Sequence, residues 1–408
     1  MSMFGLKEAE VAELVRAVAG RDLDRAAIEE RFARATWTGI AEPGDRVAGA
    51  LIDAIGAPKA LTVVVDKWSV ERLTAELGAN SGIPPADVSQ ALNRWMPRLN
   101  SGAALIALRQ AARAGASLRI PGDELWPAGC DDLEHFAPLA LWTRGNDAAL
   151  RAIPHSIALV GARAATGYGE HVTMEASAGL VDRGYAIVSG AAYGIDGMAH
   201  RAALASKGTT VAFLAGGVDR FYPSGHDALL GRIVEAGAVV SELPCGSPPT
   251  KWRFLQRNRL IAAASLATVV LEAGWRSGSL NTASHAGQLG RPVGAVPGPV
   301  TSAASAGCHR LIRENGAICV TNADEMAELA PLGPLTSPES LTASSTSGGA
   351  SAGLTRLFDA MSTRAPRSAA DIAARAGLSI GEVQGMLAQQ ELAGGVVERQ
   401  NGWVMVPG

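Results

Sequence analysis

The chain has 408 residues, of which 48% are hydrophobic and 18% are charged, and its formal net charge is -3. A chain of this length can bury more than one core, so a small single-domain protein is excluded. The nearly neutral charge excludes a polycation that coats nucleic acid by bulk attraction, so any nucleic-acid site must be a local patch.

The four cysteines, Cys130, Cys245, Cys308 and Cys319, form no CxxC pair and have no histidine partners at metal-ligand spacing. We therefore expect no metal site, and reduced thiols typical of an intracellular protein. No run of about eighteen apolar residues occurs, and charges stand near the N-terminus where a signal peptide needs an apolar run. The sequence predicts a cytoplasmic protein that has no contact with a membrane.

Residues 1–122 predict a small helical domain, because apolar residues recur at three-and-four spacing between Gly or Pro breaks. Within it, residues 42–61 have the helix, Gly-containing turn and helix of a helix-hairpin-helix or SAM-like unit. Such a unit can hold a DNA phosphate on backbone amides. The usual Gly-hydrophobic-Gly hairpin is missing, so a packing module and a DNA contact both stay open.

Residues 123–331 predict an α/β domain, an extended Rossmann-like fold with a doubly wound parallel sheet. From Ile157, short β-branched runs alternate with Ala-rich helices, from SIALVGA and YAIVSG through to AICVTN. Strands that are apolar on both faces and alternate with helices indicate a parallel sheet covered on both sides. Right-handed crossovers place the strand C-terminal loops along one edge, where such sheets bind ligands.

Residues 332–353 have the Pro, Ser, Thr and Gly-rich composition of a flexible linker. Residues 354–408 predict a winged helix-turn-helix domain, with three short amphipathic helices and a hairpin that turns at Asn401-Gly402. Its second helix carries Glu382 and Glu391 but no Lys or Arg, which argues against reading a major groove. A contact with protein, or regulation of the central domain, fits this helix better.

The first candidate binding loop follows the strand IALV and contains Gly161, Ala162 and Arg163. A glycine-bearing turn that leads into a helix N-terminus can bind phosphate through backbone N–H groups and the helix dipole. The spacing is not GxGxxG, and no acidic residue ends the second strand to hold a ribose. A dinucleotide is therefore disfavoured, and we expect no cofactor.

The second candidate loop, Ser189 to Asp196, follows the strand YAIV in the same way. Gly190 and Gly194 permit close approach of an anion, and the Ser189 hydroxyl can donate a hydrogen bond. A tight strand-to-helix turn in which Asp196 caps the next helix explains the same residues. Both interpretations stay open.

The third candidate is the segment KWRFLQRNRLIAAAS, residues 251–265, with no acidic residue between Glu242 and Glu272. It combines the basic residues Lys251, Arg253, Arg257 and Arg259 with the aromatic residues Trp252 and Phe254. Cations neutralise phosphates and aromatic faces stack on unpaired bases, so this mixture predicts a single-strand groove. The prediction requires Arg257 and Arg259 to face the first two loops rather than form internal ion pairs.

Two further loops follow later strands, at Ser277, Gly278 and Ser279 and at Pro297-Gly298. The serine hydroxyls can hold phosphate oxygens, but backbone geometry alone explains both loops equally well. No GxSxG, HExxH or Walker motif occurs, and no histidine is placed as a general base. We therefore predict a binding protein rather than an enzyme.

These motifs, in this order, resemble the DNA-processing protein A family, also called DprA or Smf. The matching segments are VGAR, SGAAYGIDGMAHRAAL, FYP, SELP, FLQRNRLIAAAS, LEAGWRSGSLNTASHA, GRPVGAVPG and LIRENGA. The resemblance implies binding and protection of single-stranded DNA, and loading of the RecA recombinase during recombination or natural transformation. It also implies a homodimer formed through the Rossmann-like domain.

The resemblance further implies roles for single residues. It assigns DNA contact to Arg163 and Lys251, and a base-stacking or wall position to Phe254. Arg257, Asn258 and Arg259 would line the same groove, while Gly161, Ser189 and Gly190 would present backbone amides to phosphate. The chain departs from the family at Ala162, where Ser is usual, and at Leu255, where Pro is frequent. Neither change removes a charge.

Two alternatives belong to other functional classes. A Rossmann-like nucleotide phosphoribohydrolase of the lysine-decarboxylase-like group also has Gly-rich loops at strand ends. Its PGGxGTxxE motif carries a catalytic Glu after the glycines, whereas this chain has EAGWRSGSLNTA there. A transcription regulator would use the winged helix on duplex DNA, with the Rossmann-like domain sensing a nucleotide.

Overall fold

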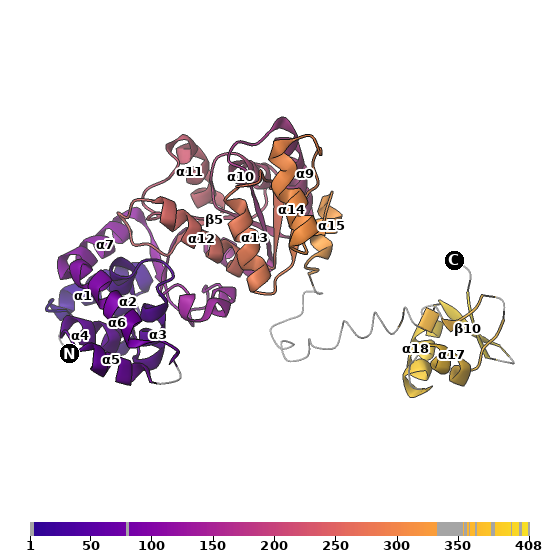
Figure 1. Cartoon of the computed structure of the whole chain (residues 1–408), viewed down its shortest axis with the longest axis horizontal. Coiled ribbons are helices and arrows are strands. Elements are labelled where there is room, and N and C mark those ends of the chain that lie inside the picture. The colour runs from indigo at the N-terminus through magenta and orange to yellow at the C-terminus, as the bar shows by residue number, and fades with distance from the viewer. Residues whose placement is uncertain are drawn as a thin grey trace. The chain divides into compact units, whose positions relative to one another are not determined.

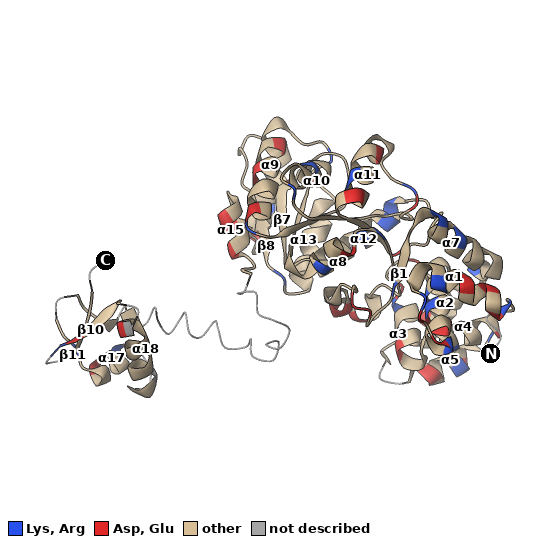
Figure 2. Cartoon of the chain, turned by 180° about the vertical axis from the view of Figure 1, so that it is seen from behind, with Lys and Arg blue, Asp and Glu red and all other residues tan. Residues whose placement is uncertain are grey.

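The computed structural model of the chain describes residues 4–78, 81–332, 354, 357–358, 360–363, 365–376, 380–392, 394–399 and 402–406. The chain forms two compact units, Met1–Leu332 and Gly333–Gly408. Almost all of the predicted linker, and Asn401 of the predicted hairpin turn, lie outside the described residues. Figure 2 shows basic and acidic residues interspersed over the first unit.

The first unit begins with seven α-helices that gather beside the sheet (Figure 1). They are α1 (Glu8–Ala19), α2 (Arg25–Ile40), α3 (Arg46–Ile55), α4 (Ala57–Val65), α5 (Val70–Leu77), α6 (Pro85–Trp95) and α7 (Ser101–Ala114). The side chains of Asp24, Asp45 and Asn100 cap helices α2, α3 and α7 by accepting backbone N–H bonds. At the centre, the rings of Trp37 and Trp95 meet edge to face at 5.0 Å.

The predicted helix-hairpin-helix segment forms α3 and α4, which meet at an angle of 112° around Gly56. Every side chain from Val47 to Ile52 is buried, so α3 is a packing element on most of its surface. By length and composition alone, the bent pair of α3 and α4 passes the test for a broken membrane span. No single helix among the described residues could span a membrane.

A sheet of nine strands forms the other part of this unit. The strands are β1 (Ser117–Arg119), β2 (Leu141–Gly145), β3 (Ser156–Gly161), β4 (Ala186–Ser189), β5 (Thr210–Phe213), β6 (Ala238–Ser241), β7 (Ala267–Glu272), β8 (Val293–Ala295) and β9 (Ile318–Cys319). Their order across the sheet is β1-β2-β6-β5-β4-β3-β7-β8-β9. All neighbours from β6 to β9 are parallel, whereas β2 pairs antiparallel with β6 and with β1.

The predicted Rossmann-like α/β fold is therefore confirmed, with an antiparallel extension at one edge. Its helices are α8 (Asp147–Arg151), α9 (Gly167–Asp182), α10 (Ile195–Ala205), α11 (Asp227–Ala236), α12 (Lys251–Ala264), α13 (Ser279–Gln288), α14 (Ala306–Glu314) and α15 (Ala323–Glu328). Apolar residues of α9, α10 and α15 share one core with Ile157 and Leu159 of β3. Those of α8, α12, α13 and α14 share a second core with Ala158 and Val160. Alternate residues of one strand thus serve opposite faces, as a doubly wound sheet requires.

The strand order reverses beside β3. The chain proceeds from β3 to β6 in one direction, and then crosses to β7 on the other side of β3. The loops after β3 and β7 consequently diverge and leave a crevice at the carboxyl edge of the sheet. This topological switch point is where a ligand site is expected.

The helical part and the sheet are packed together rather than joined only by a linker. One hydrophobic core contains Trp37 and Leu51 of the helices together with Trp142, Ala212 and Val239 of the sheet. Trp142 also donates its indole N–H to Thr38 Oγ1 at 3.3 Å. The helices α1 to α7 therefore complete the core on one side of the sheet.

In its described residues the second unit has two of the three predicted helices and both strands of the predicted hairpin, while residues 355, 356 and 359 of the first predicted helix lie outside them. These elements are α17 (Ala369–Ala376), α18 (Ile380–Leu392), β10 (Val396–Arg399) and β11 (Gly402–Met405). The two strands pair antiparallel, and Leu357, Ile372, Leu387 and Val396 are buried in a core of their own. This small core explains why the unit is compact by itself.

The contact between α3 and the 3-10 segment η3 (Ala128–Phe136) has no room for a side chain at Gly49. A Cβ there would lie 2.1 Å from the carbonyl oxygen of His135. Gly49→Ala should lower the free energy of unfolding by about 1–3 kcal/mol, because backbone must move to admit the methyl group. Urea unfolding monitored by circular dichroism measures this change.

Gly231→Ala is the matched control. Gly231 lies inside α11, and a Cβ there would meet nothing within 4 Å. This variant should be more stable than the wild type by about 0.5–1 kcal/mol, because alanine loses less backbone entropy in a helix. Equal effects of the two substitutions would contradict the close approach at Gly49.

Candidate nucleic-acid interface

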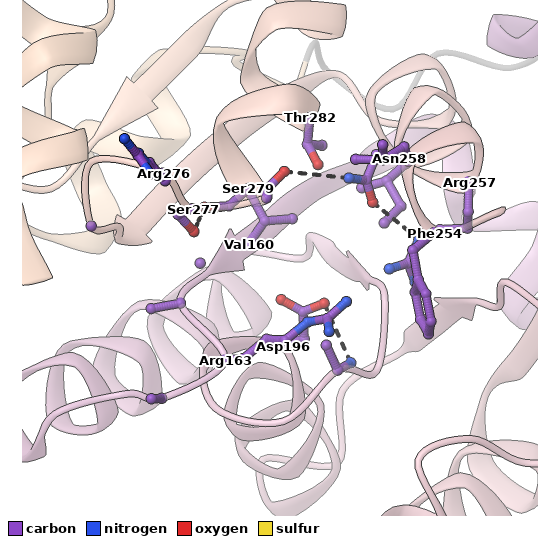
Figure 3. A pocket seen from close by; sticks show the side chains of 18 of the residues that line it. Val160, Arg163, Asp196, Phe254, Arg257, Asn258, Arg276, Ser277, Ser279 and Thr282 are labelled. Carbon is purple, nitrogen blue, oxygen red and sulfur yellow. Dashed lines mark hydrogen bonds between the residues drawn. The ribbon is translucent and has the colours of Figure 1, made fainter. Parts of the chain in front are cut away.

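A pocket of about 550 Å³ opens at the topological switch point (Figure 3). Three segments form most of its wall, namely the loop after β3, helix α12, and the loop after β7 with the start of α13. The lining residues are Val160, Gly161, Ala162, Arg163, Ala164, Ala192, Asp196, Phe254, Leu255, Arg257, Asn258, Ile261, Gly274, Arg276, Ser277, Gly278, Ser279, Thr282 and Ala304. Segments about a hundred residues apart in sequence thus build one site.

Eight of the twelve predicted DNA contacts lie in this lining, and four do not. The eight are Gly161, Arg163, Phe254, Arg257, Asn258, Ser277, Gly278 and Ser279. Ser189, Gly190, Lys251 and Arg259 are outside the lining. Internal hydrogen bonds explain why Ser189, Gly190 and Arg259 do not line the pocket. Lys251 does not line it because of its position at the start of α12.

The loop after β3 is held rigidly by the end of β7. Ala162 N–H donates to the carbonyl of Glu272 at 2.7 Å, and a Cβ at Gly161 would lie 2.5 Å from Ile195 Cγ1. Thr166 caps α9 and also donates its N–H and hydroxyl to the Glu272 carboxylate, at 2.9 and 2.6 Å. The start of α9 is therefore already occupied by an internal carboxylate, and the predicted phosphate site there is not open.

The loop after β4 uses its polar groups internally. The Ser189 hydroxyl donates to the Leu159 carbonyl at 2.6 Å, and the Gly190 N–H donates to Asp196 Oδ2 at 3.2 Å. Asp196 does not cap α10, whose N-cap is Gly194 without a side-chain bond. Asp196 instead fixes the preceding loop, because Ala192 N–H also donates to it at 3.4 Å. Ser189 and Gly190 thus stabilise the loop next to the pocket without lining it.

Gly190 is needed because the guanidinium of Arg257 lies against it. A Cβ at Gly190 would be 2.2 Å from Arg257 Nη1. That nitrogen donates to the carbonyls of Gly190 and Phe213, both at 2.6 Å. Arg257 therefore faces the loop after β4, as predicted, but through internal hydrogen bonds.

Arg257 and Asp196 are buried opposite charges at the pocket floor. Burial lowers the pKa of Arg257 to about 10, partly offset by Asp196, so this side chain stays charged at neutral pH. Burial also raises the pKa of Asp196, while Arg257 and nearby backbone N–H groups act in the opposite direction. The Arg257 guanidinium is thus held in place at the floor with the Asp196 carboxyl beside it.

Arg163 differs from Arg257 because it is exposed and has no ion pair among the described residues. Its guanidinium lies 4.9 Å from the centre of the Phe254 ring, a cation–π distance. Phe254 also packs on the exposed ring of Tyr222 at 5.6 Å, and Arg257 lies 5.8 Å from it. A free cation and an aromatic face therefore stand together at the mouth of the pocket.

The Ser277 to Ser279 triplet forms the opposite wall. The two serine hydroxyls are 2.8 Å apart, and Asn258 Nδ2 donates to the Gly278 carbonyl at 3.4 Å. Asn258 thereby links α12 to the start of α13 across the pocket. The hydroxyls lie in the lining, where they can donate to an anion.

The predicted basic cluster of α12 is divided between surface and interior. Arg253 donates to Glu42 of the helical part at 3.1 and 2.9 Å. Arg259 is 3% exposed and donates to both carboxylate oxygens of Glu242, at 2.7 and 2.6 Å. The requirement stated for Arg259 is therefore not met, since it forms an internal ion pair. Lys251 and Trp252 are exposed at the start of the helix, beside the pocket rather than in its wall.

Sequence reasoning missed Arg276 and Thr282, and it did not place Asp196 in the pocket. Arg276 directly precedes the Ser277 triplet and is exposed, so an isolated basic residue beside that loop was the available signal. Among the described residues, no cluster of His, Cys, Asp or Glu could hold a metal ion. The exposed Arg163 can bind an anion, and Phe254 beside it can bind a flat ring.

Comparison with known proteins gives a consistent result. The family model described as DNA recombination-mediator protein A matches residues 117–331, and the DprA winged helix domain model matches residues 341–402. The chain is 46% identical over 303 residues to a putative DNA processing protein DprA of Mycobacterium tuberculosis, covering 71% of this chain and 77% of the relative. It is 43% identical over 192 residues to protein Smf of Escherichia coli, covering 47% and 50%.

A solved structure extends the similarity to the fold. The X-ray structure of DNA processing protein A from Streptococcus pneumoniae superposes with a TM-score of 0.57 at 28% sequence identity. The superposition covers 74% of this chain and 97% of that one. The architecture around the pocket is thus shared with a protein of known structure.

The Arg259–Glu242 pair generates a prediction about stability. Arg259→Met should lower the free energy of unfolding by about 3–5 kcal/mol, because Glu242 is left as a buried charge without its partner. Burial raises the pKa of Glu242, and Arg259 opposes this effect. In the variant, the pKa of Glu242 is higher in the folded state than in the unfolded chain. Protonation therefore favours the folded state, and the loss of stability should shrink as the pH falls toward about 4. Urea titrations at several pH values measure it.

Arg183→Met is the control, because the Arg183–Asp324 pair is more exposed. Its loss should stay below about 1 kcal/mol at every pH. The double variant Arg259→Met, Glu242→Gln should recover part of the lost stability. An Arg259→Met variant as stable as the Arg183→Met control would contradict the assignment of Arg259 to the interior.

Proposed function

Because the chain belongs to the DNA recombination-mediator protein A family, also called DprA or Smf, we propose that it binds single-stranded DNA at the β3–β7 pocket. A role in DNA processing or recombination follows from the family. The finer proposal is that the chain protects the strand and helps to load the RecA recombinase onto it. Natural transformation and general recombination are the two settings in which such loading is needed.

The observation that carries the proposal is the free Arg163 guanidinium stacked on Phe254 at the pocket mouth. A nucleotide offers a phosphate for the cation and an unpaired base for the ring. A duplex hides its base faces in the stack, so an aromatic wall of this kind favours a single strand. Arg257 is hydrogen-bonded internally and faces Asp196, so the exposed Arg163 is the cation that a phosphate can reach.

We propose that the pocket binds without catalysis. Asp196 is the one acid in the lining, and it is tied to backbone N–H groups and faces Arg257. A carboxylate held in this way is poorly placed to activate water at a ribose. Incubation with nucleoside monophosphates tests this point, and metal-independent release of the base would favour a phosphoribohydrolase instead.

We further propose a cytoplasmic homodimer that contacts RecA. The family resemblance supports both partners, and the edge strand β9 offers a place for a second copy. β9 pairs with β8 on one side, and its residues Ile318 and Cys319 are exposed. An unpaired edge with an apolar side chain favours association with another chain. Sedimentation and mixing with RecA measure these two contacts.

Strand preference tests the proposal directly. Unlabelled oligothymidylate should displace a labelled single strand far more effectively than a duplex of the same length, because the pocket needs unpaired bases. Fluorescence anisotropy competition at several salt concentrations measures both affinities and their salt slopes. A preference for duplex DNA would instead favour a winged-helix transcription regulator.

Replacement of Arg163 tests the cation at the pocket mouth. Arg163→Ala should weaken oligothymidylate binding by about tenfold to a hundredfold, since one charged hydrogen bond is lost. The loss should be equal for other sequences, because phosphate contacts carry no base information. The slope of log affinity against log salt should become shallower by about 0.7.

Arg232→Ala is the matched control for that variant. Arg232 is an exposed arginine on α11 and is outside the pocket lining. Its removal changes the net charge by the same amount and should leave affinity and salt slope close to the wild type. Equal losses in the two variants would mean that only net charge matters, which would contradict a site at Arg163.

A further inference from the structure

Two of the eight tryptophans of the chain are strongly exposed, and one of them, Trp275, stands between the pocket-lining residues Gly274 and Arg276. Trp252 and Trp275 are each 56% exposed. By contrast, Trp37, Trp95 and Trp142 are fully buried in the core. Trp252 is in α12, but it stands two residues before Phe254 and therefore lies on a different face of that helix from the pocket-lining residues Phe254 and Arg257. Trp275 lies in the loop after β7, and nothing in the family resemblance assigns it a role.

The backbone around Trp275 is fixed by hydrogen bonds. Ser277 N–H donates to the Gly274 carbonyl at 3.1 Å, which closes a turn around the tryptophan. Gly307 N–H donates to the Ala273 carbonyl at 2.7 Å, which attaches the start of α14 to this turn. A Cβ at Gly307 would lie 2.6 Å from the Gly274 carbonyl oxygen, so only glycine allows this approach. The indole is thus exposed on a rigid support.

Arg310 follows Gly307 by about one helical turn and covers one face of the indole. Its guanidinium lies 4.8 Å from the Trp275 ring centre. Neither Arg310 nor Arg276 forms an ion pair with any residue that the structure describes. The indole ring has a cation over one face, and its other face is exposed. An exposed aromatic face of this kind can stack on a flat group. The two free arginines add positive charge on either side of the indole ring.

The Trp275 loop and Phe254 stand on opposite sides of the pocket. In Figure 3, Arg276 and Ser277 lie at one side, Phe254 and Arg257 lie at the other, and Arg163 lies between them. One side therefore combines the Phe254 ring with Arg257, and the other combines the exposed indole of Trp275 with the free cation Arg276. A polymer with alternating anionic and aromatic groups matches this repeated pattern, whereas a single nucleotide would use one side alone.

We propose that Trp275 is a second stacking platform for single-stranded DNA. The strand fills the pocket with one nucleotide and continues over the β7 loop, where a base stacks on the open face of the indole. Arg276 and Arg310 neutralise the phosphates that flank this base. The binding track thus crosses the loop edge from Phe254 to Trp275. This inference rests on the proposed function of the pocket.

Affinity as a function of strand length provides the first test. We compare oligothymidylates of about 4 and about 16 nucleotides, the ends of the range of single-strand site sizes. Trp275→Leu should bind the longer strand about five-fold to a hundredfold more weakly than wild type, as expected for one lost stack. The shorter strand, held mainly by the pocket, should lose much less. Trp275→Phe should lie between Trp275→Leu and wild type, because a smaller ring still stacks.

Two matched controls separate stacking from general surface changes. Phe136→Leu removes an exposed aromatic side chain that is 48% exposed and outside the pocket lining, and it should bind both strands normally. Arg313→Ala removes an exposed arginine one turn beyond Arg310 on α14 and should also be normal. Arg310→Ala should weaken binding of the longer strand. Equal effects of Arg310→Ala and Arg313→Ala would overturn the assignment of Arg310.

Photo-crosslinking gives a direct readout of contact. Oligothymidylates that carry one iodouracil at successive positions are irradiated with the wild-type protein, and the linked peptides are mapped by mass spectrometry. Crosslinks to Trp275 should arise from positions toward one end of the strand, and those to Phe254 from positions toward the other. Absence of any crosslink to Trp275, together with unchanged affinity of Trp275→Leu for both lengths, would overturn the inference.

These experiments distinguish failure of the second stacking platform from failure of the proposed function of the pocket. If the wild type binds oligothymidylate and Arg163→Ala weakens it while Trp275→Leu does not, the proposed function stands and the second platform fails. If the wild type does not bind a single strand, both fall together. Loss of RecA or dimer contact in Trp275→Leu, with normal binding of both strand lengths, would assign the exposed indole to a protein partner and overturn its role in DNA binding.

Discussion

A guanidinium group buried between the ends of β4 and β5 fixes the geometry of the pocket. Arg257 donates to the carbonyls of Gly190 and Phe213 and faces Asp196, so one side of α12 is tied to the carboxyl edge of the sheet. Phe254 precedes Arg257 by three residues and therefore lies on the same side of the helix. The ring is held against Arg163 because Arg257 cannot move. The aromatic wall of the site depends on this buried charge.

The α/β architecture was predictable because its signals are local. The strands from β3 to β9 are short β-branched runs, and β4 to β7 are buried along their whole length, as expected for a covered parallel sheet. β1 and β2 were not predicted from the sequence. β1 lies inside residues 1–122, for which a helical domain was predicted, so the sheet begins earlier than expected. Both strands are short and pair antiparallel at the sheet edge, so neither a helical alternation nor a continuous apolar run marks them.

The site was predicted less completely, because its partners come from distant parts of the chain. No acid stands near Arg253 in sequence, yet it pairs with Glu42, 211 residues away. The glycines Gly161 and Gly190 suggested close approach of a phosphate, but a Cβ at these positions would meet Ile195 and Arg257 of the chain itself, and only Gly161 lines the pocket. A glycine pattern indicates that something approaches the backbone closely, and it does not distinguish a ligand from the protein's own side chains.

The core that the helices α1 to α7 share with the sheet limits how this chain can be rearranged. Removal of these helices would leave Trp142, Ala212 and Val239 facing water, and would leave Arg253 without Glu42. Loss of these helices would therefore destabilise the sheet, because apolar side chains that the two parts share would be exposed. The winged-helix unit has its own core and carries no such restriction. Variation between related proteins should accordingly be easier at the C-terminal end than at the N-terminal end.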